Sequence, residues 1–149
     1  MLGNGYVCQS GTYATHITGI PYTLNTSSND GTWSTSGKVS WNTNGGVRLG
    51  YYTSGAHSMT KSFHIPANLT VKVTANGVVN GTLGINNTAQ IIVGSTTVID
   101  KTQKGTSEAS FSCSSANASM SSSSNTVKCT CSYSLQAAKV VVKGLEIKY

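Results

Sequence analysis

The stretch Val127-Lys-Cys-Thr-Cys-Ser-Tyr-Ser-Leu135 carries the clearest secondary-structure signal in this 149-residue chain. Apolar or thiol side chains alternate there with Lys, Thr and Ser, and this period of two puts one face of a β-strand against a core and the other in water. Just upstream, Ala109, Phe111 and Cys113 alternate with serines in the same way. Residues 109–113 and 127–135 are therefore predicted to form half-buried strands.

Short segments of the same kind recur along the chain, at roughly the spacing of all-β sandwich strands. Turn residues separate them: Asn76-Gly77 predicts a tight hairpin, Gly144 predicts a β-bulge in the last strand, and residues 114–125 predict a flexible, serine-rich loop. No segment keeps a helical period for more than a turn. We expect strands at 12–20, 38–42, 47–53, 59–65, 69–75, 78–83, 89–93, 96–100, 107–114, 127–135 and 139–149.

This pattern predicts an all-β, antiparallel β-sandwich, either jelly-roll-like or immunoglobulin-like. The jelly roll is preferred, because Cys113 and Cys131 lie too close in sequence for the immunoglobulin Cys…Trp…Cys arrangement and no Trp stands between them. The length suits one core. We expect a flexible N-terminal arm or linker at residues 1–11 and a single β-sandwich domain at residues 12–149.

The composition favours an extracellular, cell-surface or virion protein. Only 9% of the residues are charged, so Ser, Thr, Asn and Gly must supply the polar surface. The net charge of +6 comes from scattered basic residues, which predicts weak attraction to anionic surfaces but no specific nucleic acid partner. No apolar run is long enough for a membrane span, and residues 1–20 do not have the basic and apolar regions of a signal peptide.

The four cysteines permit two disulfides with three possible connectivities. If residues 109–113 and 127–133 pair as a hairpin, Cys113 lies across from Cys129 or Cys131 and a bridge can form there. The alternative is that these cysteines are buried thiols that act as small hydrophobic residues. A zinc site built from the same three residues is disfavoured, because structural zinc ligands usually come from knuckles with two to four intervening residues. We expect no metal and no cofactor.

No catalytic residues are predicted. The four acidic side chains, Asp30, Asp100, Glu108 and Glu146, are spread over different expected elements, whereas glycoside hydrolysis needs two that flank one bond. The chain also lacks the Gly-x-Ser-x-Gly elbow of an α/β-hydrolase. The sequence therefore argues against an enzyme.

Four aromatic residues form the remaining candidate site. Trp33, Trp41, Tyr51 and Tyr52 fall within or beside polar loops, and a flat ring amid hydroxyl and amide groups is typical of a glycan-binding face. The alternative places Trp41 and Tyr51 in the core and leaves Tyr52, with or without Trp33, on the surface. For Trp41 the pattern favours the core.

Two functions from different classes remain. The first hypothesis is a non-enzymatic surface module for assembly or adhesion, of the phage-appendage or bacterial surface-fibre type, whose partners are its own subunits in a homo-oligomer. The alternative is a carbohydrate-binding module of a secreted glycan-active protein, with surface glycans as its partners. An enzyme is the least favoured reading.

Overall fold

The structure is a computed structural model, and it describes residues 17–149. The arm predicted at residues 1–11 and most of the strand predicted at residues 12–20 lie outside the described residues. The part of that segment that is described, residues 17–20, is not a strand, and β1 begins at Tyr22.

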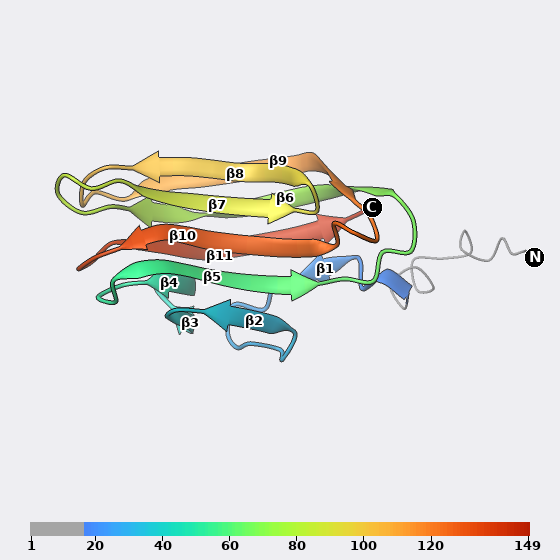
Figure 1. Cartoon of the computed structure of the whole chain (residues 1–149), viewed down its shortest axis with the longest axis horizontal. Helices are drawn as coiled ribbons and strands as arrows, with labels where there is room; N and C mark the ends of the chain where they lie inside the picture. Colours follow the sequence, from blue (N-terminus) through green and yellow to red (C-terminus); the bar gives the residue numbers. More distant parts are fainter. Residues whose placement is uncertain (1–16) are drawn as a thin grey trace, which may run out of the picture.

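Within residues 17–149, eleven strands form two antiparallel sheets that face each other (Figure 1). This confirms the predicted all-β sandwich. One sheet holds β1 (Tyr22–Thr23), β3 (Val39–Thr43), β4 (Gly46–Gly50), β6 (Leu69–Asn80), β9 (Ala109–Met120) and β11 (Lys139–Lys148). The other holds β2 (Trp33–Ser36), β5 (Gly55–Ser62), β7 (Asn87–Val93), β8 (Thr96–Gln103) and β10 (Thr126–Ser134).

The order of the strands is that of a jelly roll. The six-stranded sheet runs β3-β4-β11-β6-β9, with β1 also pairing with β11, and the five-stranded sheet runs β2-β5-β10-β7-β8. From β4 onward, the eight strands form two four-stranded layers in which β4-β11-β6-β9 faces β5-β10-β7-β8. The preference for a jelly roll over an immunoglobulin-like sandwich is therefore confirmed.

The core lies between the two inner faces, and the period of two decides which side chains reach it. Val127, Cys129 and Cys131 of β10 are all fully buried, as their alternation predicted. Gly144 also fulfils its prediction, since the pairing register of β11 shifts between Val142 and Gly144. The largest fully buried side chains from both sheets are Leu49, Met59, Ile91, Met120 and Ile147.

The hairpin predicted at Asn76-Gly77 is wrong, because β6 runs straight through these residues. Gly77 has a packing role instead of a turn role. A Cβ atom there would lie 2.1 Å from the carbonyl oxygen of Val141 and 2.4 Å from the ring of Phe111, so only glycine fits between β11 and that ring.

The flexible loop predicted at residues 114–125 is also wrong in most of its length. β9 continues to Met120, and Ser121 and Ser124 close a short turn with two backbone hydrogen bonds. The change of conformation expected near Ser114 is a β-bulge, where Ser115 has a φ of 51° and its amide N–H bonds to Thr74 Oγ1.

The predicted disulfide between Cys113 and either Cys129 or Cys131 is not formed, and all three are free thiols. The expected hairpin does not exist, because β9 pairs with β6 in one sheet while β10 pairs with β5 and β7 in the other. Burial raises the pKa of Cys129 to about 12 and that of Cys131 to about 11, so both stay protonated at neutral pH. The alternative, buried thiols that act as small hydrophobic residues, describes Cys129 and Cys131, while Cys113 is half-buried.

Four of the connections between the two layers gather at one end of the sandwich, on the left in Figure 1: β4–β5, β6–β7, β8–β9 and β10–β11. We call it the Tyr52 end, and it comprises residues 51–54, 81–86, 104–108 and 135–138. The opposite end carries the β5–β6, β7–β8 and β9–β10 connections and the C-terminus.

Candidate functional site

Exposed apolar side chains concentrate at the Tyr52 end. Of the four large apolar residues that are exposed within residues 17–149, two lie there, Tyr52 at 65% and Leu83 at 89%, and Tyr133 at 37% lies beside it near the end of β10. The fourth, Tyr149, is the C-terminal residue and lies at the other end. Single exposed apolar side chains are ordinary, but an aromatic ring held in one position on the surface is a candidate for binding.

The backbone that presents Tyr52 is strained. Gly50, Tyr51 and Tyr52 have φ values of 85°, 85° and 53° in succession. Glycine adopts such angles freely, but a residue with a bulky side chain at positive φ is an outlier that costs on the order of 1–3 kcal/mol. Two consecutive tyrosines in this region persist only because their surroundings hold them.

Hydrogen bonds from the β10–β11 connection hold both tyrosines. The Tyr51 N–H donates to Ser134 Oγ at 2.8 Å and lies 3.1 Å from the Ala138 carbonyl oxygen, while the Tyr52 N–H donates to the Gln136 carbonyl. The Ser134 hydroxyl, which is fully buried, in turn donates to the Ala138 carbonyl at 2.8 Å. The β4–β5 turn is thus fastened to the β10–β11 turn.

His57 supports the same turn from within. It is only 2% exposed, its Nδ1 accepts the Lys38 N–H at 2.7 Å, and its Nε2 lies 2.8 Å from the Thr53 carbonyl oxygen. Because Nδ1 accepts, Nε2 carries the proton and donates to Thr53, so the imidazole is the neutral Nε2–H tautomer. Both of its nitrogens are used, and His57 has a structural role.

An aromatic and cationic cluster covers this frame. The rings of Tyr51 and Tyr52 lie edge to face with their centroids 4.7 Å apart. The guanidinium carbon of Arg48 lies 4.2 Å from the centroid of the Tyr51 ring, and the Lys38 ammonium donates to the Tyr51 carbonyl at 3.2 Å. We call Lys38, Arg48, Tyr51 and Tyr52 the tyrosine cluster. The sequence pattern predicted its aromatic members but not its two cations, which come from a strand and a turn with no local signature.

Trp33 does not join the tyrosine cluster. It begins β2, is only 5% exposed, and donates its indole N–H to the Tyr22 hydroxyl at 2.8 Å. It pairs across from Lys61 near the far end of β5, whereas Tyr52 lies just before the first residue of β5. At about 3.3 Å per strand residue the two aromatic residues are roughly 20 Å apart.

Trp41 takes a third position, on the edge strand β3. It is half-buried, packs against the core, and donates its indole N–H to the Asn25 carbonyl at 3.1 Å. The four aromatic residues thus do not share one face: Tyr51 and Tyr52 lie together, while Trp33 and Trp41 serve packing elsewhere.

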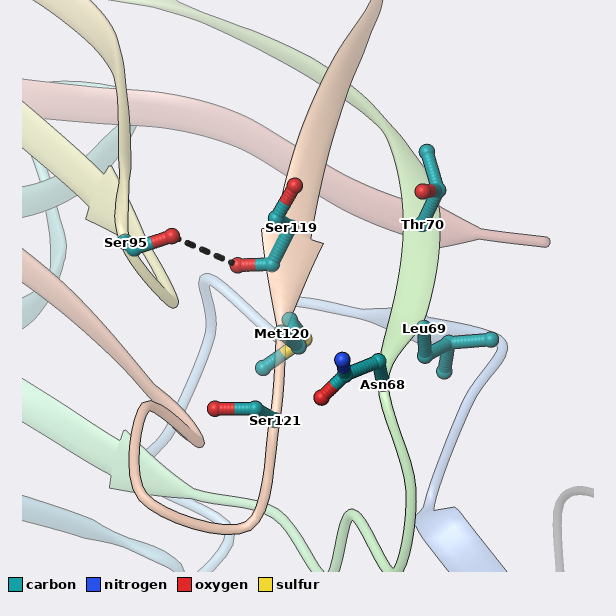
Figure 2. Close-up of a pocket in the computed structure, with 7 residues that line it drawn as sticks. All are labelled: Asn68, Leu69, Thr70, Ser95, Ser119, Met120 and Ser121. Atoms are coloured by element: carbon teal, nitrogen blue, oxygen red, sulfur yellow. Dashed lines mark hydrogen bonds between the residues drawn. The ribbon is translucent and has the colours of Figure 1, made fainter.

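A small polar pocket lies at the opposite end of the sandwich (Figure 2). It has a volume of about 350 Å³ and lies where β6 begins, β9 ends and β7 turns into β8. No aromatic or charged side chain lines it, and the Ser119 carbonyl accepts both the backbone N–H and the hydroxyl of Ser95. The lining residues are Asn68, Leu69, Thr70, Ser95, Ser119, Met120 and Ser121.

A second hollow, of about 470 Å³, lies across the six-stranded sheet at the Gly144 bulge. Its lining includes Thr74, Asn76, Lys143 and Glu146, again without an aromatic ring. Neither hollow offers the flat apolar surface that Tyr52 supplies.

Within the described residues, no group of three or more His, Cys, Asp or Glu side chains could hold a metal ion. The four acidic side chains are also dispersed: Glu108 pairs with Lys139, Glu146 pairs with Lys148, Asp30 bonds to Tyr22 and Thr32, and Asp100 lies on β8. Among residues 17–149, no helix is both long and apolar enough to cross a membrane.

No protein-family model matches this chain, and no curated protein matches its sequence. Several solved structures resemble it. A carbohydrate-binding module CBM36 in complex with calcium and xylotriose is 12% identical, with 85% of this chain and 99% of that chain covered and a TM-score of 0.47.

Two further structures resemble the chain to the same degree. The CBM36-1 domain of a multidomain xylanase from the hindgut metagenome of Trinervitermes trinervoides is 16% identical, with 86% and 96% covered and a TM-score of 0.44. A family 35 carbohydrate-binding module from Clostridium thermocellum is 12% identical, with 85% and 97% covered and a TM-score of 0.45. Because these identities and scores are low, no residue role transfers from these structures to this chain.

Proposed function

We propose that this domain is a non-catalytic carbohydrate-binding module, and that the tyrosine cluster is its binding site. One observation carries the proposal: the ring of Tyr52 is 65% exposed, yet its backbone is held at a strained positive φ by hydrogen bonds from another loop. Strain of this kind is concentrated at ligand-binding and catalytic positions, because a fold that gained nothing from it would replace the residue.

The chemistry of the site suits a sugar. An exposed aromatic ring offers its face to the apolar side of a pyranose, and the edge contact with Tyr51 fixes the orientation of that ring. Hydroxyl and amide groups on the neighbouring loops, including Thr53, Ser54 and Gln136, are available to hydrogen-bond the sugar hydroxyls. A small, rigid platform with polar surroundings binds one or two sugar residues and needs no deep pocket.

The same proposal places the protein outside the cell. A surface rich in Ser, Thr and Asn and poor in charge suits a module that meets glycans, whether it is secreted or displayed on a surface. The free thiols Cys113, Cys129 and Cys131 give no support for an oxidising compartment, so the location rests on composition and on the proposed ligand.

A glycan array followed by calorimetry on the hits tests the proposal. Wild-type protein should bind at least one glycan, and Tyr52→Ala should weaken that binding about fivefold or more, since stacking on an aromatic ring is worth on the order of 1 kcal/mol or more. Tyr149→Ala removes another exposed tyrosine, at the opposite end, and should leave binding unchanged. An array without hits, or equal affinities for wild type and Tyr52→Ala, would rule this site out.

A second candidate, assembly through the edge of β9, is favoured by a separate observation. β9 is the edge strand of its sheet, is twelve residues long and contains no charged side chain. Within residues 17–149, its far edge receives a backbone hydrogen bond only at Ser119, from the Ser95 N–H. The Ser115 bulge separates that end from residues 109–114, which remain free to pair with a second copy of the chain.

Light scattering coupled to size exclusion tests the assembly candidate. A dimer or higher oligomer that becomes monomeric in Ser110→Lys would support it, because a lysine on an edge strand blocks pairing between edges. Ser58→Lys, on the central part of β5, is the matched control and should leave the oligomer intact. A wild-type monomer at high concentration would end this candidate and leave the carbohydrate-binding proposal untouched.

A further inference from the structure

We infer that the tyrosine cluster selects sugars that carry an anionic group, with Arg48 as the residue that binds the anion. This inference rests on the proposed function, since it names the class of glycan that the same site takes. The argument starts from a positive charge that the protein leaves uncompensated beside its exposed ring.

Arg48 is the only arginine in the chain, and it forms no ion pair with any residue between 17 and 149. The carboxylates that could neutralise it are engaged or distant in the fold. Glu108 is held by the Lys139 ammonium at 3.0 Å, Glu146 lies beside Lys148, Asp30 is bonded within its own loop, and Asp100 lies in the other sheet. The charge of Arg48 is therefore not neutralised by any carboxylate among residues 17–149.

The hydrogen-bonding groups of this guanidinium are also largely unused. Nη1 donates to the neutral side-chain amide of Asn44 at 3.2 Å, and Nε is buried without an acceptor. Nη2 has no acceptor within the described part of the chain and is not among the buried unpaired atoms, so it meets solvent. A guanidinium normally donates its five N–H groups to carboxylates or phosphates, and here most of them donate to no group among residues 17–149.

The guanidinium is nevertheless held in place. It lies over the face of the Tyr51 ring, with 4.2 Å between its central carbon and the ring centroid, and this cation–π contact fixes its plane. The ring of Tyr51 meets the ring of Tyr52 at an interplanar angle of 86°. Arg48 and the exposed ring are thus joined through one rigid residue.

A second cation strengthens the field at this point. The Lys38 ammonium donates to the carbonyl oxygen of Tyr51 at 3.2 Å and has no carboxylate partner in residues 17–149. Two positive charges therefore contact Tyr51: Arg48 contacts its ring, and Lys38 contacts its backbone carbonyl. No acidic side chain belongs to the tyrosine cluster.

These features match a pyranose that stacks on Tyr52 and turns a carboxylate or a sulfate toward Arg48. A planar guanidinium binds both groups through charge-assisted hydrogen bonds, which are roughly twice as strong as neutral ones. A neutral sugar would leave the charges of Lys38 and Arg48 without an anionic partner. The shared chemistry is an anion on a sugar ring, and the test separates its two sources.

Titration calorimetry with matched ligands tests the inference on the wild-type protein. The probes are an oligomer of galacturonic acid, the same oligomer with every carboxyl group methyl-esterified, a sulfated κ-carrageenan oligosaccharide, and the same oligosaccharide after its sulfate groups have been removed. We expect an anionic probe to bind about tenfold or more tightly than its neutral counterpart, as one charge-assisted hydrogen bond provides. The preferred pair shows whether the site reads a carboxylate or a sulfate.

Variants then locate the effect. Arg48→Gln should remove the preference for the anionic probe, and Arg48→Lys should restore only part of it, because an ammonium cannot form a planar two-bond contact. Lys128→Gln removes the same amount of charge from the exposed face of β10 and should keep the preference. Thermal unfolding of each variant checks that the domain is folded, and the esterified probe checks the inference without any substitution.

The outcomes distinguish the two proposals. If wild type binds neutral and anionic probes equally, or if Lys128→Gln weakens binding as much as Arg48→Gln, anion selection by Arg48 is wrong while the glycan site stands. If no sugar of either kind binds, both proposals fail together.

Discussion

The hydroxyl of Ser134 accepts the amide N–H of Tyr51 at 2.8 Å, although 83 residues separate the two in sequence. The same hydroxyl donates to the Ala138 carbonyl, so one buried oxygen fastens the β4–β5 turn to the β10–β11 turn. This contact helps to hold Tyr51 and Tyr52 at positive φ angles, which are unfavourable for residues with bulky side chains.

Ser134→Ala should therefore loosen the tyrosine cluster. The substitution leaves a buried carbonyl without its hydroxyl donor and removes one of the two acceptors of the Tyr51 N–H, which costs about 1–3 kcal/mol of unfolding free energy. Urea denaturation measures the loss, and amide hydrogen exchange at Tyr51 should quicken. Ser110→Ala, which removes an exposed hydroxyl without a hydrogen-bond partner among the described residues, serves as the control and should leave both quantities unchanged.

The fold itself was largely predictable, because half-buried strands show their period in the sequence. Residues 127–131 and the bulge at Gly144 were read correctly for that reason. The errors came where one local sequence pattern, such as Asn-Gly, can arise either from a turn or from a packing requirement. Asn-Gly is the usual hairpin signal, but here Gly77 is required by the Phe111 ring and the Val141 carbonyl, which lie far away in sequence.

The site was predictable only in part, because contacts between residues far apart in sequence also decide which aromatic side chains are exposed. An aromatic residue beside polar ones shows in the sequence, but its exposure is decided by strands that pair later in the chain. Trp33 and Tyr52 looked alike, yet the first is buried against Tyr22 and the second stands in solvent. Nothing local distinguishes Arg48 from any other strand cation, because the sequence does not show that the nearby Asn44 and Tyr51 fold against its guanidinium.

Tyr52→Asn should separate stability from binding. Asparagine tolerates positive φ, so relief of about 1–3 kcal/mol of strain offsets the lost ring contact with Tyr51, worth about 0.5–1.5 kcal/mol. We expect an unfolding free energy within about 1 kcal/mol of wild type and no measurable glycan binding. A loss of several kcal/mol would instead assign Tyr52 to packing and remove the argument from strain.

Trp33→Phe should behave in the opposite way, because Trp33 belongs to the core. The variant leaves the Tyr22 hydroxyl without its indole donor and opens a small cavity, which together cost on the order of 2–4 kcal/mol. Burial raises the pKa of Tyr22 to about 12 although the Trp33 hydrogen bond lowers it, so the variant should ionise Tyr22 at still higher pH. Ultraviolet titration of tyrosinate reports that shift. Glycan binding, measured at a temperature where the variant is folded, should not change.

Gly77→Ala should be among the most destabilising single changes in the chain. Its Cβ would meet a backbone oxygen at 2.1 Å and the Phe111 ring at 2.4 Å, and neither can move without shifting β11 or the core. Overpacking of this kind costs about 1–3 kcal/mol or more. Gly144→Ala is the matched control, because its Cβ would meet only the exposed Asn76 amide, at 2.7 Å, which can rotate away. Equal losses in urea denaturation would contradict the packing role of Gly77.

The buried thiols make the domain sensitive to alkali. The thiol of Cys129 has an ordinary pKa of about 9, which burial raises to about 12 in the folded state. A group whose folded pKa is raised gives its full stabilisation below the unfolded pKa and loses it as the pH climbs toward the folded pKa. The unfolding free energy should therefore fall between pH 9 and 12, by about 1.4 kcal/mol per pH unit for each such thiol.

Cys129→Val tests the assignment, because valine fills a similar volume and cannot ionise. Urea denaturation at pH 7, 9, 10 and 11 should show a shallower decline for the variant, while Cys131, whose pKa burial raises to about 11, keeps its own share of the slope. The comparison between variants cancels the titration of lysines and of Tyr22, which both chains share. Identical slopes for wild type and Cys129→Val would mean that the alkaline decline comes from other groups, and that this strand admits solvent to its thiol.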